Sequence, residues 1–182
     1  MTAWWLNFVM YETGWLLCVI GAAFGVGGWG AAFAMFLVCV HVMLATERGV
    51  ELRLVMAAAA CGLVVDFLLI RAGVLRFFEP GVVEGFPPLW MTVLWMQFAT
   101  TLRYCLSWLS GRYLLGGIFG LAGAPAAFLG GARLGAVAVC TPALPGLLYL
   151  GVLWSVVIPL LVWLSVRFGG GRCLAGYRWL VR

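Results

Sequence analysis

Polar side chains interrupt the apolar segment at residues 88–110, and their types suit the binding of an anionic group. Gln97, Thr101 and Arg103 lie on one side of a helix when each residue advances the chain by about 100°. A guanidinium group binds phosphate or carboxylate through a fork of N–H donors, and an amide and a hydroxyl can add hydrogen bonds. These three residues are therefore candidate ligand-binding residues.

Other ionisable side chains within apolar segments could accept or donate a proton. Glu12, His41 and Asp66 are of this kind, and with Arg103 they form the candidate catalytic set. Arg133, near the end of another apolar segment, is a further candidate for anion binding. The chain has one histidine and six scattered cysteines, so we predict no metal site and no cofactor.

The composition indicates which environment holds these residues. Hydrophobic residues make up 65% of the 182-residue chain and charged residues only 9%, whereas a typical soluble domain carries about 25% charged residues. We therefore predict an integral membrane protein. The polar side of 88–110 then faces the protein interior and its apolar side faces lipid, because an arginine exposed to lipid is costly.

Six segments are long and apolar enough to cross a bilayer, which requires about 20 residues. The sequence thus predicts an all-α fold, a compact bundle of six transmembrane helices within residues 1–167, followed by a basic cytoplasmic tail at 168–182. The predicted spans are 4–24, 28–46, 53–73, 88–110, 113–133 and 146–167.

The arginines predict the orientation of this bundle. Seven lie at the end that holds both termini, against about three at the opposite end, where Glu79 and Glu84 also lie. The positive-inside rule then places both termini in the cytoplasm. The tail, with Tyr177 and Trp179, either contacts anionic lipid head groups or only fixes the topology. Four arginines beside a membrane are too few for a nucleic-acid surface.

Depth along the helices groups the charged residues into two layers. At about 1.5 Å per residue, Glu12, His41 and Arg103 lie about 8–13 Å from the cytoplasmic ends of their spans. Asp66 lies about 10 Å from the outer end of its span, with Gln97 near its level and Arg133 or Arg71 beyond. The layers are either functional sites or interhelical ion pairs, such as Glu12–Arg103 and Asp66–Arg133.

Small residues recur along the fifth predicted span at spacings of three and four. This seam allows a neighbouring backbone to approach closely and predicts helix packing, within the bundle or in a homo-oligomer. Its members are Gly116, Gly120, Gly123, Ala127 and Gly130.

Several stretches resemble the DUF2878 family of small bacterial inner-membrane proteins of unknown function. They are NFVMYETGWLLCVIGAA, PPLWMTVLWMQFATTLRYCLSWL and GAPAAFLGGARLGA, together with His41, Asp66 and Glu51-Leu52. The resemblance covers nearly the whole chain and implies a multi-pass protein of the bacterial inner membrane. Members are often encoded near lipid-modification proteins, which implies membrane lipids, and a lipid-modifying enzyme, as partners.

Three functions are consistent with these observations. The first is lipid binding or lipid modification, in which Arg103 or Arg133 holds a phosphate and Asp66 or Glu12 accepts a proton. The second is a small membrane transporter, although no inverted repeat is visible. The third is a non-catalytic scaffold whose buried charges serve packing. The sequence leaves open whether the protein is an enzyme.

Overall fold

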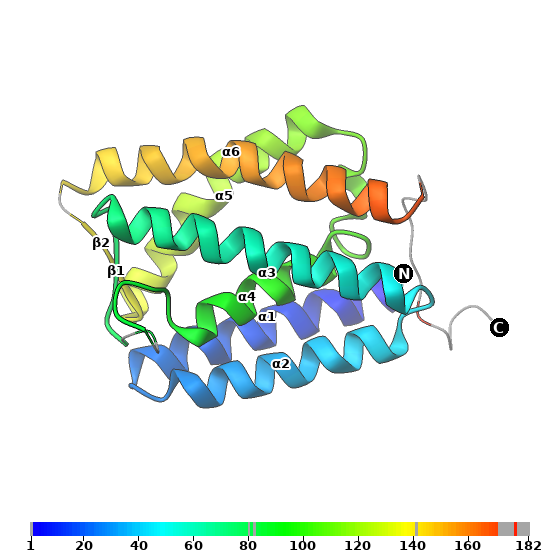
Figure 1. The fold of residues 1–182 in the computed structure, drawn as a ribbon, viewed down its shortest axis with the longest axis horizontal. Helices are drawn as coiled ribbons and strands as arrows, with labels where there is room; N and C mark the ends of the chain where they lie inside the picture. The colour runs from blue at the N-terminus through cyan, green and yellow to red at the C-terminus, as the bar shows by residue number, and fades with distance from the viewer. Residues whose placement is uncertain (1, 80, 82, 141, 171–176, 178–182) are drawn as a thin grey trace.

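The computed structural model describes residues 2–79, 81, 83–140, 142–170 and 177, and it is all-helical apart from one small β-pair (Figure 1). The α-helices are α1 (Thr2–Ala23), α2 (Gly27–Leu44), α3 (Arg48–Arg71), α4 (Leu89–Thr101), α5 (Tyr113–Leu134) and α6 (Ala143–Phe168). Strands β1 (Leu75–Phe77) and β2 (Val137–Val139) and the 3₁₀ helix η1 (Ser107–Leu109) complete the described elements.

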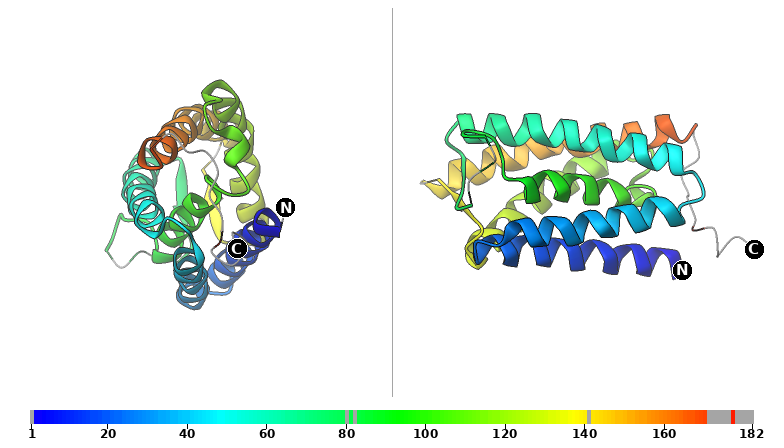
Figure 2. Two further views of the ribbon diagram at one scale, coloured as in Figure 1. Left: turned by 90° about the vertical axis from the view of Figure 1, so that its right-hand side faces the viewer. Right: turned by 60° about the horizontal axis from the view of Figure 1, so that its bottom comes forward.

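Five helices, α1, α2, α3, α5 and α6, are long and apolar enough to cross a membrane. Seen end-on, they surround α4 (Figure 2). The predicted helical membrane bundle is therefore confirmed. The chain passes along the bundle six times, so the beginning of α1 and the end of α6 lie at the same end, which we call the terminal end (Figure 1).

Helix α4 differs from the span predicted at 88–110. It has only 13 residues, about 20 Å of helix, against a hydrocarbon core of about 30 Å. Beyond Thr101 the chain continues through turns and η1 to the terminal end of the bundle. Non-helical backbone at membrane depth is tolerated where protein buries it, and residues 101–105 are all buried.

The prediction that the fourth span turns an apolar side to lipid is wrong. Of the five residues on that apolar side, Leu106 is partly buried. The other four, Phe98, Leu102, Cys105 and Leu109, are at most 9% exposed. The central position of α4 explains this, because the surrounding helices cover it on several sides. The hydrophobicity of this segment therefore reflects burial in protein instead of contact with acyl chains.

Hydrogen bonds to side chains end α4 at Thr101. The Thr101 hydroxyl donates to the Phe98 carbonyl at 2.6 Å, and Asn7 of α1 donates its amide to the Thr100 carbonyl at 3.1 Å. In the turn that follows, the backbone N–H of Cys105 donates to Asn7 Oδ1 at 3.3 Å. These bonds satisfy groups that a continuing helix would pair with its own backbone.

The α3 helix begins earlier than predicted. It starts at Arg48 instead of residue 53, so the stretch expected to be a loop contributes its first turn. Glu47 occupies the N-cap position and Glu51 lies in the first turn. Carboxylates are favourable there because a helix N-terminus carries partial positive charge.

The opposite end of the bundle is closed by the β1–β2 pair. The strands are antiparallel, with Leu75 opposite Val139 and Phe77 opposite Val137. The loop after β1 also caps a helix, because the backbone N–H of Gly27 at the start of α2 donates to Glu79 Oε2 at 3.1 Å.

Candidate functional site

A cavity of about 340 Å³ lies between α1, α4 and α5, and we call it the aromatic cavity. Its α1 wall consists of residues at helical spacing: Trp4, Phe8, Tyr11, Glu12, Trp15 and Val19. Trp90, Trp95, Phe98 and Trp108 of α4 and η1, Phe119 and Phe128 of α5, and Trp154 of α6 add further aromatic rings. The volume is within the range of small-molecule sites, about 300–1,000 Å³.

The aromatic cavity extends through much of the membrane depth and opens at the protein surface. From Trp4 to Val19 its wall follows about 22 Å of helix. Trp4, Phe8 and Phe119 line it and are also 37–38% exposed. An apolar molecule in the bilayer could therefore enter sideways between α1 and α5.

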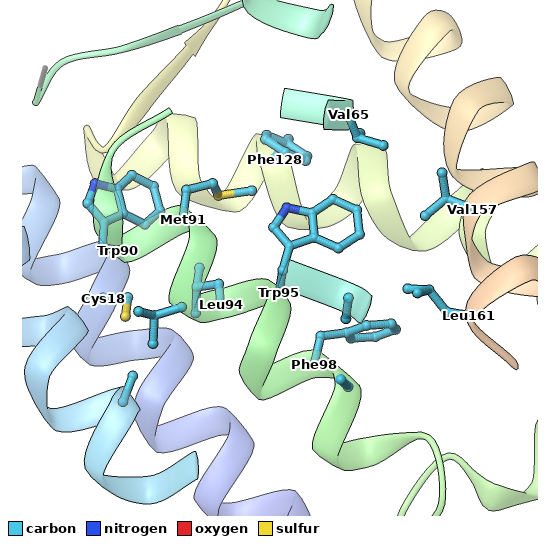
Figure 3. Close-up of a cluster of buried hydrophobic side chains, with 14 of the residues drawn as sticks. Cys18, Val65, Trp90, Met91, Leu94, Trp95, Phe98, Phe128, Val157 and Leu161 are labelled. Carbon is cyan, nitrogen blue, oxygen red and sulfur yellow. The ribbon is translucent and has the colours of Figure 1, made fainter. Parts of the chain in front are cut away.

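Trp95 lines the cavity and connects it to Asp66. Figure 3 shows its indole among the buried side chains of Val65, Phe98 and Phe128. Its indole stacks on Trp154 with centroids 4.5 Å apart, and its Nε1 donates to Asp66 Oδ2 at 2.7 Å. Gly62 of α3 makes room for the ring, because a Cβ there would lie 2.1 Å from Trp95 Cγ. The other carboxyl oxygen of Asp66 has no hydrogen-bond partner in the described part of the chain.

The predicted outward layer does not form. Asp66 pairs with neither Arg133 nor Arg71, and both arginines are exposed. Gln97 is buried, but it turns toward α1, where its amide donates to the Met10 carbonyl at 2.9 Å. Asp66 of α3 instead accepts a hydrogen bond from the indole N–H of Trp95 on α4. Hydrophobic patterning placed Asp66 and Gln97 within apolar segments, but it did not give the direction in which their side chains point.

A second polar group lies at the terminal end and is mostly buried, and we call it the buried polar cluster. It is built around Arg103, whose Nη1 donates to Glu51 Oε1 at 2.7 Å and whose Nη2 donates to Glu47. The other Glu51 oxygen lies 3.3 Å from His41 Nε2. Arg103, Glu51 and His41 are at most 1% exposed.

Tyr177 closes this cluster from the tail. Its hydroxyl lies 3.1 Å from His41 Nδ1, its backbone forms an isolated bridge with Ala45, and its ring packs against Tyr104. Burial raises the pKa of Tyr177 to about 12. The suggestion that Tyr177 contacts lipid head groups is thus wrong. Trp179, Arg172, Arg178 and Arg182 of the predicted tail lie outside the described residues.

The predicted inward layer is only partly assembled. His41 and Arg103 do share one cluster, joined by Glu51, but Glu12 forms no ion pair with Arg103 and lines the aromatic cavity instead. Arg103 is occupied by two carboxylates and lines no part of the cavity, so in this arrangement it is not free to hold a phosphate. Thr101 lines the cavity next to the turn.

The small-residue seam of α5 has two environments. Gly116 and Gly120 face α6, and a Cβ on Gly120 would lie 2.2 Å from the Trp154 carbonyl oxygen. Gly123 and Ala127 line the aromatic cavity, and Gly130 lies near the Trp15 ring. Part of the seam therefore brings α5 against α6, and part leaves open space.

Sequence reasoning gave no site role to Asn7, Glu47, Glu51 and Trp95, and it placed Tyr177 in a tail at the membrane surface. One signal was available, because the α1 aromatic residues recur at intervals of three and four. The partners of Arg103 were harder to find, since the first turn of α3 looks like a charged loop.

The family model described as a protein of unknown function, DUF2878, matches residues 4–160. The chain belongs to this family. No curated protein and no solved structure matches the chain. In this DUF2878 protein, the matched region contains the entire lining of the aromatic cavity and the buried polar cluster apart from Tyr177.

Proposed function

We propose that this DUF2878 protein binds the apolar chain of a membrane lipid in the aromatic cavity, and that this binding serves lipid modification. The observation that supports the proposal is a cavity lined almost entirely by aromatic and aliphatic side chains that opens on the lipid-facing surface between α1 and α5. Large aromatic surfaces bind hydrocarbon well, and a site open to the bilayer needs no aqueous route.

The buried polar cluster has a structural role in this proposal. His41, Glu51 and Arg103 are at most 1% exposed and are bonded within the cluster, so the described structure does not present His41 or Arg103 to a substrate. The cluster holds the non-helical turn after α4 against α3 and the tail. The lipid is then bound by the aromatic wall, and a separate lipid-modifying enzyme is the expected partner.

Photo-crosslinking tests the binding step. The purified protein is incubated with a phospholipid that carries a diazirine on its acyl chain, irradiated, and mapped by mass spectrometry. We expect labelled peptides from the cavity faces of α1 and α5. Ala127→Phe, which places a ring in the cavity, should reduce this labelling several-fold. Ala126→Phe is the matched control, because Ala126 is exposed on the same helix and does not line the cavity.

Two crosslinking results would contradict the proposal. If labels occur only on outward-facing positions, or if both phenylalanine variants label like the wild type, the cavity does not hold a lipid chain. In cells, an altered acyl or head-group profile in a deletion strain supports the lipid role. Unchanged lipids with altered solute uptake would favour the transporter alternative.

We further propose that the terminal end faces the cytoplasm of a bacterial inner membrane. Arg48, Arg53, Arg112 and Arg167 lie at this end of the described chain, and the positive-inside rule supports the assignment. Single cysteines introduced into a cysteine-free variant test it with an impermeant maleimide. Glu84→Cys should label in intact cells, whereas Thr46→Cys should label only after lysis, and the reverse pattern would contradict the orientation.

A further inference from the structure

Glu12 is the charged residue of the aromatic cavity. It lies on the cavity face of α1, where the neighbouring lining residues in the sequence are Tyr11 and Trp15. Among the described residues, no other residue of the lining carries a formal charge. Ten residues of helix, about 15 Å, separate it from the beginning of α1, so it lies near the middle of the bilayer. The carboxylate is half-buried.

Within the described part of the chain, Glu12 has neither an ion pair nor a hydrogen bond from another side chain. The contrast with the terminal end is informative, because Glu47 and Glu51 both bond to Arg103 there. An ionisable group inside a membrane is costly unless it is paired, and such a group marks a functional site by default. A ligand is therefore the natural source of the missing partner.

The aromatic lining of the cavity favours a cation as that partner. Trp4, Phe8, Tyr11, Trp15 and Trp108 all line the cavity, and the negative face of an aromatic ring attracts ammonium groups. A carboxylate within an aromatic wall adds direct charge complementarity. An anionic head group finds no such partner among the described residues, because none of the arginines among them lines the cavity.

We propose that the aromatic cavity selects amphiphiles with a cationic amine or quaternary ammonium group, which Glu12 and the rings around it bind near the membrane midplane. This inference rests on the proposed function, since the same cavity holds the apolar chain. It adds the class of ligand: the apolar tail fills the cavity and the positive group contacts Glu12.

Competition against the diazirine lipid tests this selectivity in nonionic maltoside micelles. Three probes share one tail and differ in charge: hexadecyltrimethylammonium, hexadecanol and hexadecyl sulfate. For the wild type we expect the cation to compete best, by about tenfold over the alcohol, with the sulfate weakest. Glu12→Gln should abolish the preference, and Glu12→Asp, which keeps the charge, should retain most of it.

Glu84→Gln is the matched control, because it removes the same charge from an exposed loop. It should preserve the ranking and so exclude a general attraction of cations to the protein. Equal competition by the three probes, or an unchanged preference in Glu12→Gln, would overturn the proposal. If Glu12→Gln does not fold, the ranking in the wild type decides.

The two proposals fail in different ways. If the wild type shows no preference for the cation while its labelling is intact and sensitive to Ala127→Phe, only the role of Glu12 is refuted. Absence of cavity labelling in the wild type refutes lipid binding itself.

Discussion

Replacing Arg103 with methionine should strongly destabilise the protein, because it leaves carboxylates without their cation. Arg103 is 1% exposed, and its Nη1 lies 2.7 Å from Oε1 of the fully buried Glu51. Methionine retains much of the side-chain volume but none of the charge. Removing one partner of a buried ion pair typically costs about 3–5 kcal/mol of unfolding free energy. We expect a loss of that size for Arg103→Met.

The carboxylates of Glu51 and Glu47 should differ in how much each one destabilises the Arg103→Met variant. Glu51 is 0% exposed, whereas the side chain of Glu47 is 28% exposed and can be partly solvated. Adding Glu51→Gln to Arg103→Met removes the stranded charge and should recover about 2–3 kcal/mol, which is the upper range of coupling between contacting residues. Adding Glu47→Gln should recover about 1 kcal/mol or less, as for a partly exposed pair.

The assay is reversible unfolding in mixed micelles, followed by tryptophan fluorescence, for the wild type, each single variant and both double variants. The cycle gives the coupling of Arg103 with each carboxylate. If Arg103→Met unfolds at the wild-type free energy, the cluster does not support the fold. If the Glu51→Gln double variant is no more stable than Arg103→Met alone, the stranded carboxylate is not the cause of the loss.

Three further predictions concern stability. The pKa of Tyr177 is about 12 in the folded protein and about 10 when unfolded, so the unfolded chain loses its proton first and stability should fall as pH rises from about 10 to 12. Gly62→Ala should cost about 1–3 kcal/mol, because its Cβ would overlap the Trp95 ring. Gly120→Ala should cost a similar amount, since its Cβ would meet the Trp154 carbonyl and force α5 from α6.

Each of these predictions has a control measured by the same unfolding assay. The Tyr177→Phe variant should lose less stability than the wild type as pH rises from about 10 to 12. If the stability of both proteins has the same pH dependence, burial does not raise the pKa of Tyr177. Gly28→Ala is the control for Gly62, and Gly123→Ala is the control for Gly120, because neither site would place a Cβ closer than 4.0 Å to a neighbouring atom. Alanine at these helical control sites should be neutral or stabilising by up to about 1 kcal/mol.

Hydropathy could predict the membrane environment, the helical fold and the shared end of both termini. Each of these properties depends on the hydropathy of segments of about 20 consecutive residues, which can be calculated from the sequence alone. Helix α4 shows the limit of this reasoning. Its composition suits contact with lipid and burial in protein equally well, so only its central position shows which one applies.

The sequence predicted that His41 and Arg103 lie at one level of the bundle, but it did not predict the carboxylates that they meet. His41 and Arg103 were expected at one level, and they do share a cluster, but the carboxylate that joins them is Glu51 instead of Glu12. Pairing depends on the rotation of each helix about its axis and on which helices are neighbours. Neither quantity is local in the chain.

The sequence by itself determined that this protein is a helical bundle in a membrane, because burying so much apolar surface in lipid leaves little alternative. Only the tertiary structure decided that α4 ends inside the bundle, that Asp66 meets Trp95, and that Glu12 faces an open cavity. The physical reason is that these features arise from contacts between helices distant in the chain. Small residues such as Gly62 and Gly120 allow those contacts, and a Cβ at either position would prevent them.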